Sequence, residues 1–319
     1  MVAQDIRERA LGAVIGAAVG DALGAHYEFC DPADIAKMGD IDMLPDGPYP
    51  RPAGQWTDDT AMANCILGVA AKGLNLNSKA GLDAVTRAFQ EWRNSNPRAI
   101  GRQINAVLGF SSTHDSDELL EDSKKFPGTR KGGNGSLMRT APVALQFLEE
   151  GQAVAALTAA GKISDLTHYD QRARQACRMW TNAIRHAILL GTVQGLPSYL
   201  QNYADVDEQR FWVEKFQAAE NATVADYAPT NGWVVNAMVC AWHAISTTPG
   251  KGAQHFRDAM VKAVRIGYDT DTVTCIAGGL LGACWGVDAI PEEWKVKLQG
   301  YPGWTVVDLI ERVDAILEG

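Results

Sequence analysis

The sequence lacks several features of a secreted or zinc-binding protein. Its six cysteines form no CxxC pair, and no histidine stands at the spacing of a zinc site. Most of them lie in apolar runs, where a reduced and buried thiol is the expected state. The charged residues between positions 5 and 9 differ from the pattern of a signal peptide. We therefore expect a cytoplasmic protein with free thiols.

The chain also lacks a long hydrophobic run and an excess of basic residues. The apolar stretch 10–25 contains Asp21 and is shorter than the roughly 20 residues that a membrane-spanning helix needs. The 29 lysines and arginines are outnumbered by 38 aspartates and glutamates, which gives a net charge of -9. Because nucleic acids and anionic membranes bind basic surfaces, we expect neither as a partner.

Proline is scarce, and glycine is abundant instead. The 13 prolines and the absence of a repeat exclude collagen-like and low-complexity chains. Glycine supplies 31 of 319 residues, well above the usual share of about 7%. The glycines lie in alanine-rich segments, where they allow helices to pack closely or a backbone to approach a ligand. Two sets are expected to pack helices: Gly12, Gly16, Gly20 and Gly24, and Gly278, Gly279 and Gly282.

Helical periodicity dominates the chain and predicts an all-α fold. None of the Asn-Gly or Asp-Gly pairs is flanked by the alternating pattern of strands. Helices are expected at residues 5–24, 57–73, 81–94, 98–109, 137–150, 151–160, 171–190, 233–246, 253–266, 271–285 and 305–317. Residues 111–135 predict a long polar loop, and residues 202–230 form a polar, aromatic segment. No shift in composition marks a linker, so we expect one domain over residues 1–319.

Two acidic segments open apolar helices far apart in the chain. They are Thr57-Asp58-Asp59-Thr60 and Asp269-Thr270-Asp271-Thr272. Helix capping and the helix dipole, worth about 0.3–1 kcal/mol, explain one such residue per helix but not the doubled cluster. If the two helix starts converge, the carboxylates raise one another's pKa unless a cation neutralises them. Oxygen ligands suit Mg²⁺ or Mn²⁺ rather than zinc, so the pattern predicts a site for two such ions.

Four further features have both a functional and a structural interpretation. The glycine-rich segment 132–136 could cradle a phosphate or form a flexible loop with a helix cap. His168 could donate a hydrogen bond to an anionic ligand or be a structural residue of the core. Glu28 could be an acid near the site or a surface residue. Trp233 could stack on an adenine or pack in the core.

Ordered motifs along nearly the whole chain resemble the ADP-ribosylglycohydrolase family, which includes dinitrogen-reductase-activating hydrolases and ADP-ribosylarginine hydrolases. The matching segments are GAVIGAAVGDALGAHYEF (12–29), WTDDTAM (56–62), GNGSLMRTAPVAL (133–145), SDLTHYD (164–170), GWVV (232–235) and GYDTDTVTCIAGGLLGACWG (267–286). The resemblance implies a compact single-domain all-α fold with a binuclear Mg²⁺ or Mn²⁺ centre. The metal ligands that it implies are Thr57, Asp58, Asp59, Asp269, Asp271 and Thr272.

The resemblance also implies a binding site for ADP-ribose. Its residues would be Gly133, Asn134, Gly135, Ser136, Met138, His168, Trp233 and Tyr268. Tyr268 departs from the small residue common in the family, which would narrow the pocket or alter which linkage fits. Glu28, Asp59 and Asp271 are the candidates for taking a proton from water during catalysis.

The activity implied is hydrolysis of the N-glycosidic bond between ADP-ribose and a protein side chain, with arginine as the expected side chain. The partner would be an ADP-ribosylated protein, and the enzyme would be a monomer. Serine-linked, DNA-linked or O-acetyl-ADP-ribose remain alternative substrates. The chain could also be an immunity protein that neutralises an ADP-ribosyltransferase toxin by hydrolysis or by binding. A catalytically silent binding protein on this fold, as in crystallin-like relatives, is a further alternative, against which the six intact ligands argue.

Overall fold

Two glycine-rich helices form the centre of the fold. In this computed structural model, which describes residues 3–48, 50–110, 115–127, 132–202, 205–221 and 224–319, α1 (Gln4–Gly24) packs along α13 (Thr270–Trp285) more extensively than any other described helix pair. A Cβ atom added at Gly16 would lie 2.3 Å from the carbonyl oxygen of Gly278, and one at Gly20 would lie 2.1 Å from that of Thr274. Any side chain there would push the helices apart, so the close contact requires glycine.

The packing role expected for the glycines is confirmed for Gly12, Gly16, Gly20, Gly24, Gly278 and Gly282. It is wrong for Gly279. A Cβ atom there would meet its nearest neighbour, the Cβ atom of Ala141, at 3.4 Å, which is an ordinary van der Waals distance. One turn of helix thus contains both an obligatory glycine, Gly278, and a replaceable one.

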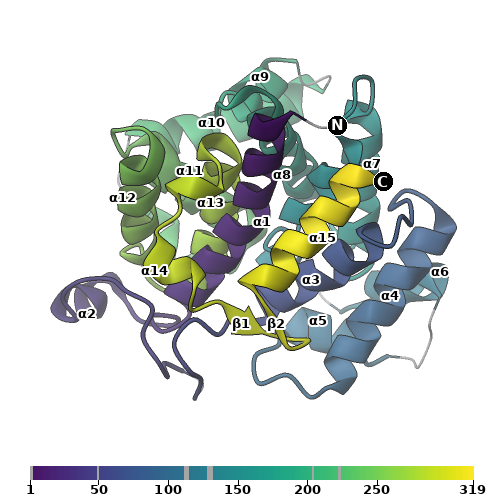
Figure 1. Ribbon diagram of the computed structural model, residues 1–319, viewed down its shortest axis with the longest axis horizontal. Helices are drawn as coiled ribbons and strands as arrows, with labels where there is room; N and C mark the ends of the chain where they lie inside the picture. Colours follow the sequence, from purple (N-terminus) through teal and green to yellow (C-terminus); the bar gives the residue numbers. More distant parts are fainter. Residues whose placement is uncertain (1–2, 49, 111–114, 128–131, 203–204, 222–223) are drawn as a thin grey trace.

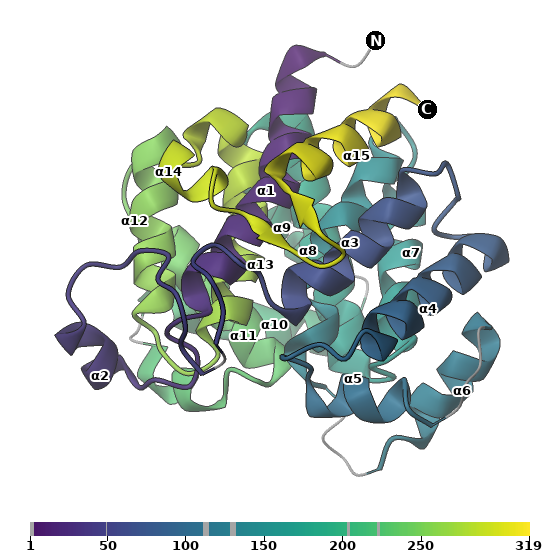
Figure 2. The ribbon, with the colours of Figure 1, turned by 60° about the horizontal axis from the view of Figure 1, so that its bottom comes forward.

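The remaining elements surround this pair. Figure 1 shows α1 crossing the middle of the molecule, with α12 and α14 on one side and α3, α4 and α15 on the other. Figure 2 shows the two chain ends on the same side of the fold and α2 at its periphery. The element bounds are α2 (Pro32–Lys37), α3 (Asp58–Ala70), α4 (Lys79–Asn94), α5 (Arg102–Val107), α6 (Ser116–Lys125), η1 (Asn134–Ser136), η2 (Ala141–Phe147), α7 (Ala153–Asp165), α8 (Gln171–Leu190), α9 (Gly195–Gln201), α10 (Val206–Asn221), η3 (Val224–Asp226), η4 (Ala228–Thr230), α11 (Val234–Ser246), α12 (Gly252–Val264), η5 (Val287–Ala289), α14 (Glu292–Lys295), β1 (Gln299–Gly300), β2 (Trp304–Thr305) and α15 (Val306–Glu318).

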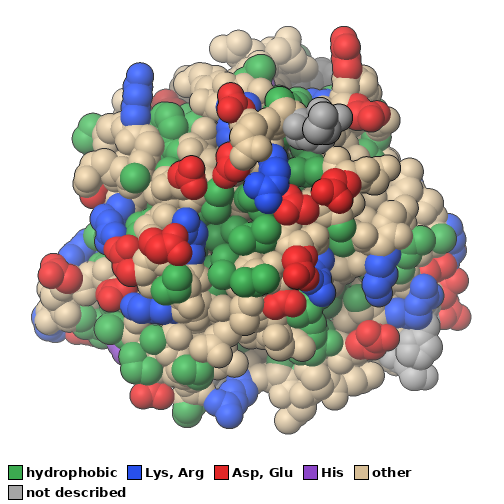
Figure 3. Space-filling view, in the orientation of Figure 1, with side chains coloured by type: hydrophobic (Ala, Val, Ile, Leu, Met, Phe, Trp, Pro, Cys, Tyr) green, Lys and Arg blue, Asp and Glu red, His purple; other side chains and the backbone are tan. Residues whose placement is uncertain are grey.

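The all-α prediction is confirmed, since the described strands form a single two-stranded antiparallel hairpin, β1–β2. Among the described residues, no helix combines the length and the hydropathy needed to cross a membrane. The face shown in Figure 3 carries acidic and basic side chains interspersed with apolar ones, so the net negative charge is not gathered into one patch there.

Several predicted elements need correction. Residues 111–135 were expected to form a loop, but α6 occupies 116–125; residues 111–114 and 128–131 lie outside the described part. The helix expected at 137–150 is the 3-10 helix η2, which contains Pro142 near its start. The helix expected at 98–109 is confined to α5. The polar segment 202–230 contains α10 and two 3-10 turns, and residues 203–204 and 222–223 lie outside the described part.

Candidate active site

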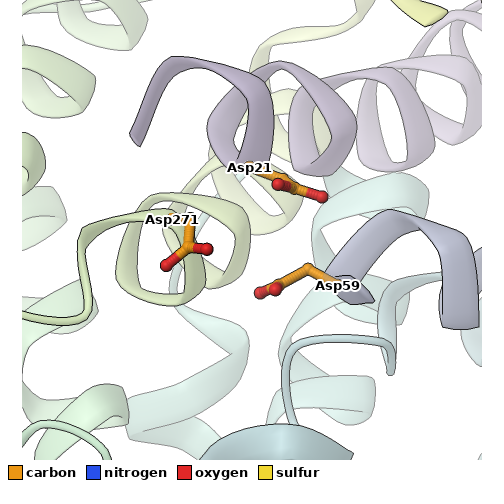
Figure 4. A group of neighbouring side chains, drawn as sticks. All are labelled: Asp21, Asp59 and Asp271. Carbon is orange, nitrogen blue, oxygen red and sulfur yellow. The ribbon is translucent and has the colours of Figure 1, made fainter. Parts of the chain in front are cut away.

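Three buried carboxylates meet where three helices converge. Asp21 lies near the end of α1, Asp59 in the first turn of α3 and Asp271 in the first turn of α13. One oxygen of each carboxylate lies within 4.8 Å of the other two. Figure 4 shows the side chains directed toward a common space from their separate helices. The convergence expected of the two acidic helix starts is therefore present, and α1 adds a third acid.

Asp21 holds the start of α3 in place. Its carboxylate accepts hydrogen bonds from the Thr57 backbone N–H at 3.0 Å, the Thr57 hydroxyl at 2.8 Å and the Thr60 N–H at 2.9 Å. The two backbone donors belong to the unpaired N–H groups that every helix start exposes. The sequence analysis missed this role, although an aspartate inside an apolar glycine-rich helix was the signal that could have shown it.

Thr57 links the three acids through its hydroxyl. The Oγ1 atom lies 3.1 Å from Oδ2 of Asp59 and 3.4 Å from Oδ2 of Asp271, in addition to its bond with Asp21. Burial, together with the charges of neighbouring acids, raises the pKa of Asp59 and that of Asp271 well above the usual range. The second oxygen of Asp59 is buried and has no hydrogen-bond partner within the part of the chain that the structure describes.

Three more acids surround this cluster at the surface of a cleft. Burial and the charges of Asp269 and Asp58 raise the pKa of Glu28 to about 8. Burial and the charge of Asp21 raise the pKa of Asp58 to about 6, although its carboxylate accepts a hydrogen bond from the Gly101 N–H at 3.2 Å. Asp269 accepts a hydrogen bond from Nδ2 of Asn134 at 2.8 Å.

This set of oxygen donors fits a hard divalent cation. Buried carboxylates with raised pKa values and an oxygen of Asp59 without a partner are destabilising unless a proton or a cation compensates them. No sulfur or imidazole ligand belongs to the described group, which excludes a typical zinc site. The cluster is therefore suited to bind Mg²⁺ or Mn²⁺.

All of these acids except Asp21 line a cleft of about 430 Å³. The predicted site residues that line it are Glu28, Asp58, Asp59, Gly133, Asn134, Gly135, Met138, His168, Asp269, Asp271 and Thr272. Thr57, Ser136, Trp233 and Tyr268 lie outside this lining. The cleft thus brings the glycine-rich segment and the two acidic segments to one place.

The glycine-rich segment is held in position by its backbone and by Asn134. Its N–H groups and carbonyls pair with the start of α11: the Asn134 N–H donates to the Gly232 carbonyl at 3.1 Å, and the Val234 N–H donates to the Gly132 carbonyl at 2.9 Å. Asn134 also donates to the Asn231 carbonyl at 3.1 Å. The segment is therefore an ordered wall of the cleft, not a flexible loop.

His168 is fixed from behind by two buried residues. Arg139 donates to the Thr167 hydroxyl at 2.7 Å, and that hydroxyl lies 2.8 Å from Nδ1 of His168. Because arginine can only donate, the Thr167 hydroxyl accepts from Arg139, and we assign its own proton to a hydrogen bond with Nδ1 of His168. The proton of the neutral ring is then on Nε2. Burial and the charge of Arg139 lower the pKa of His168 well below its usual value, so the ring is neutral. His168 thus offers an N–H donor beside Gly133, which is suited to a phosphate oxygen.

Trp233 and Tyr268 occupy different surroundings. Trp233 is 39% exposed and lines a second cavity of about 810 Å³, which shares Gly133 and Gly232 with the cleft. Tyr268 is partly buried against the core and has a positive φ of 62°. The expectation that Tyr268 narrows the pocket finds no support in the lining of the cleft.

Phe29 lines the mouth of the cleft and was not singled out in the sequence. Its side chain is 66% exposed, and its φ is 66°, which is rare for a residue with a side chain. Hydrogen bonds from the Phe29 N–H to the Tyr268 carbonyl at 2.6 Å, and from the Tyr268 N–H to the Cys30 carbonyl at 2.7 Å, hold both residues in this backbone conformation. The pair thus fixes Glu28 and Asp269, their neighbours in the chain, at the cleft.

Comparisons with known proteins agree with this geometry. A sequence model described as ADP-ribosylglycohydrolase matches residues 3–318. ADP-ribosylarginine hydrolase Tri1 of Pseudomonas putida (strain GB-1) is 27% identical over 303 residues, which cover 91% of this chain and 74% of the relative. ADP-ribosyl-[dinitrogen reductase] glycohydrolase of Rhodospirillum rubrum is 29% identical over 304 residues, which cover 93% of this chain and 92% of the relative.

Two further proteins are more distant. ADP-ribosylhydrolase ARH3 of Homo sapiens is 25% identical over 333 residues, which cover 91% of this chain and 89% of the relative. A solved structure titled ADP-ribosylglycohydrolase-related protein complex is 23% identical and superposes with a TM-score of 0.74 over 99% of both chains. This last likeness shows that the fold is shared.

Proposed function

The chain belongs to the ADP-ribosylglycohydrolase family, and on this basis we propose that it hydrolyses the N-glycosidic bond between ADP-ribose and an arginine side chain of a protein. One observation carries the proposal: buried acids from α1, α3 and α13 converge, and those of α3 and α13 line a cleft that is also lined by the glycine-rich segment. This arrangement combines a site for divalent cations with a site for a diphosphate.

The cofactors proposed are two Mg²⁺ or Mn²⁺ ions. Their ligands would come from Thr57, Asp58, Asp59, Asp269, Asp271 and Thr272. When bound, the ions would supply positive charge that attracts the ribose hydroxyls and acidifies a water molecule. Asp21 would act through these residues, because its oxygens are already occupied by the N–H groups at the start of α3 and by the Thr57 hydroxyl.

The wall of the cleft would bind the ADP-ribose itself. The Nε2 proton of His168 and the backbone at Gly133 and Gly135 would face the diphosphate. The cavity beside Trp233 would then receive the adenosine, since it continues from the cleft at Gly133. The distal ribose would lie over the acids, with its anomeric carbon near them.

Hydrolysis then needs one proton acceptor near the anomeric carbon. A water oxygen attacks this carbon, and a carboxylate takes the proton that the water loses. The carbon–nitrogen bond breaks with its electron pair remaining on the guanidino nitrogen of arginine, which gains a proton as it leaves. Glu28, Asp59 and Asp271 are the candidates, since all three line the cleft. Replacing each with its amide and comparing the pH dependence of kcat would identify the acceptor.

Arginine is supported by the name of the Pseudomonas putida relative, which specifies ADP-ribosylarginine, and the name of the Rhodospirillum rubrum relative specifies a modified protein, dinitrogen reductase. The test measures ADP-ribose release from arginine-modified and serine-modified peptides in the presence of Mg²⁺ or Mn²⁺. We expect release from the arginine-linked peptide. Release from the serine-linked peptide alone would contradict the arginine assignment.

An immunity function remains a second proposal for the biological role. In that case the partner would be an ADP-ribosyltransferase toxin, neutralised by hydrolysis or by binding. An Asp271→Asn variant separates neutralisation by hydrolysis from neutralisation by binding, because protection that survives the loss of hydrolysis requires binding.

All six cysteines are free thiols in the structure, which supports the proposal of a reducing, cytoplasmic location.

A further inference from the structure

A third cavity adjoins the cleft at residues other than those that the Trp233 cavity shares with it. It measures about 380 Å³ and shares Asp58 and Ala99 with the cleft. The cavity at Trp233 shares Gly133 and Gly232 with the cleft instead. The three spaces therefore follow one another, with the acid cluster between the outer two. If ADP-ribose occupies the first two spaces, the third remains for the protein that carries it.

A buried arginine without a partner lines this third cavity. Arg51 is only 8% exposed, and its Nη2 atom is buried with no hydrogen-bond partner among the described residues. Its charge is close enough to lower the pKa of Glu28, but the two form no ion pair in the described part of the chain. A buried charge without a hydrogen-bonded counterion is costly, so Arg51 is suited to an anionic group that arrives from outside.

The rest of the cavity defines what kind of anion fits. Trp56 and Trp92 are almost fully buried and give it apolar walls together with Tyr301. Asp58 carries negative charge at the end next to the cleft. A dianionic phosphate would be repelled there more strongly than a carboxylate with its single charge. The cavity thus fits a short side chain that ends in a carboxylate, with the Arg51 guanidinium in its lining as the counter-charge.

We propose that Arg51 binds an aspartate or glutamate of the target protein that flanks the ADP-ribosylated residue. The inference rests on the proposed function and adds to it a class of substrate, namely acidic sequences around the modified side chain. Arg51 is then a determinant of substrate specificity, and the cleft residues remain those that bind ADP-ribose.

The experiment compares two arginine-ADP-ribosylated peptides that differ only in a flanking glutamate or glutamine. For the unmodified enzyme with Mg²⁺, kcat/KM should be about tenfold higher for the glutamate peptide, as expected for a charge-assisted hydrogen bond. In Arg51→Gln this ratio should fall to about one. Arg98→Gln is the matched control, because Arg98 is exposed at the same cavity and donates to the Pro50 carbonyl; its ratio should stay high.

Two further measurements distinguish a misfolded variant from a failure of the inference. Arg51→Met serves as a second variant, and competitive inhibition by free ADP-ribose reports whether each variant keeps a folded cleft. Equal rates on both peptides with the unmodified enzyme, or a preference that survives in both Arg51 variants, would overturn the inference. If the unmodified enzyme releases no ADP-ribose from either peptide or from ADP-ribosylagmatine, whose leaving group has no carboxylate, the proposed function itself is wrong.

Discussion

His168 can act as a neutral donor only because Thr167 and Arg139 define its protonation. The Arg139 guanidinium is fully buried, stacks on the Phe89 ring at 4.5 Å and has no carboxylate partner among the described residues. Because Arg139 is positively charged, it opposes protonation of the neighbouring His168 imidazole and lowers its pKa. The arrangement keeps the Nε2 proton facing the cleft over the whole neutral pH range.

Replacing Thr167 with valine should weaken ADP-ribose binding by about three- to tenfold, the usual worth of one hydrogen bond. Valine has nearly the same shape but removes both the acceptor for Arg139 and the donor to Nδ1 of His168. Calorimetric titration with ADP-ribose measures the loss, and ¹⁵N chemical shifts of the ring report the tautomer. Thr158→Val is the control, since that hydroxyl bonds only within α7. An unchanged tautomer in Thr167→Val would contradict the assignment.

Asp21→Asn should lower kcat/KM by about 10- to 100-fold and raise the Mg²⁺ concentration needed for half-maximal activity, as is typical when a residue that orients metal ligands is lost. An amide has one accepting oxygen in place of two, so it cannot bind all the donors at Thr57 and Thr60. Asp34→Asn, which removes only an exposed pair with Lys37, is the control. Loss of activity with unchanged Mg²⁺ dependence would show that Asp21 does not act through the metal ligands.

The sequence predicts the residues that stand in motifs and misses those that act through the fold. The doubled acidic segments and the glycine-rich segment could be identified because residue type and order carry the chemistry. Phe29 and Arg51 could not, because each becomes significant only when α13 or a cavity wall is placed beside it. Asp21 carries a signal as an acid inside an apolar helix, but its partners are known only once α3 is placed beside it.

At the level of helices, the matched pair Gly278 and Gly279 tests the packing of α1 on α13. Gly278→Ala should destabilise the protein by about 1–3 kcal/mol, because the new Cβ atom would lie 2.1 Å from the Gly16 carbonyl oxygen. Gly279→Ala should be neutral or stabilising, since alanine favours helix by about 1 kcal/mol where space allows. Urea unfolding measures both. Equal destabilisation of the two variants would show that helix packing does not select glycine here.

Elements were predictable where apolar periodicity and end signals agree. Helix α8 begins and ends at the predicted residues 171 and 190, with the Asp170 side chain capping its start and Gly191 in the left-handed conformation at its end. Helix α6 has few apolar residues, so its sequence looks like a loop until Leu119 is buried by packing. Periodicity alone could not distinguish the 3-10 helix η2 from an α-helix.

For the molecule as a whole, the acid cluster couples stability to pH and to metal. The unfolded chain loses its carboxyl protons near pH 4, whereas the ion-free folded chain keeps protons on Asp59 and Asp271 and on Glu28, whose pKa is raised to about 8. The stability from these groups is therefore complete at low pH and is lost as pH rises toward 8. The lowered pKa of His168 acts in the opposite direction, but only near and below pH 6.5.

The stabilisation by Mg²⁺ should consequently be larger at pH 8 than at pH 6.5. The cation takes the place of the protons, and its binding becomes easier as they leave. Thermal unfolding with Mg²⁺ and with a chelator at both pH values measures the difference. A Mg²⁺-induced rise in Tm that is the same at pH 6.5 and pH 8 would contradict the assignment of the cluster as the metal site.

We further propose that residues 1–319 form one domain and act as a monomer. Helix α1 from the start of the chain packs on α13 and α15 from its end, so the two ends of the described chain share one core. The sequence predicted the fold class and the two helix starts that meet, but it could not show that α1 brings a third acid beside them, because that depends on packing between residues far apart in the chain.

The central claim is that the converging acids use divalent cations to release ADP-ribose from modified arginine. The most direct measurement is ADP-ribose release from an arginine-ADP-ribosylated protein as a function of Mg²⁺ or Mn²⁺ concentration, for the unmodified chain and for Asp271→Asn and Asp58→Ala. The account predicts saturable, chelator-sensitive release by the unmodified chain and at least a hundredfold loss in the variants. Release that persists in a chelator, or in both variants, would contradict it.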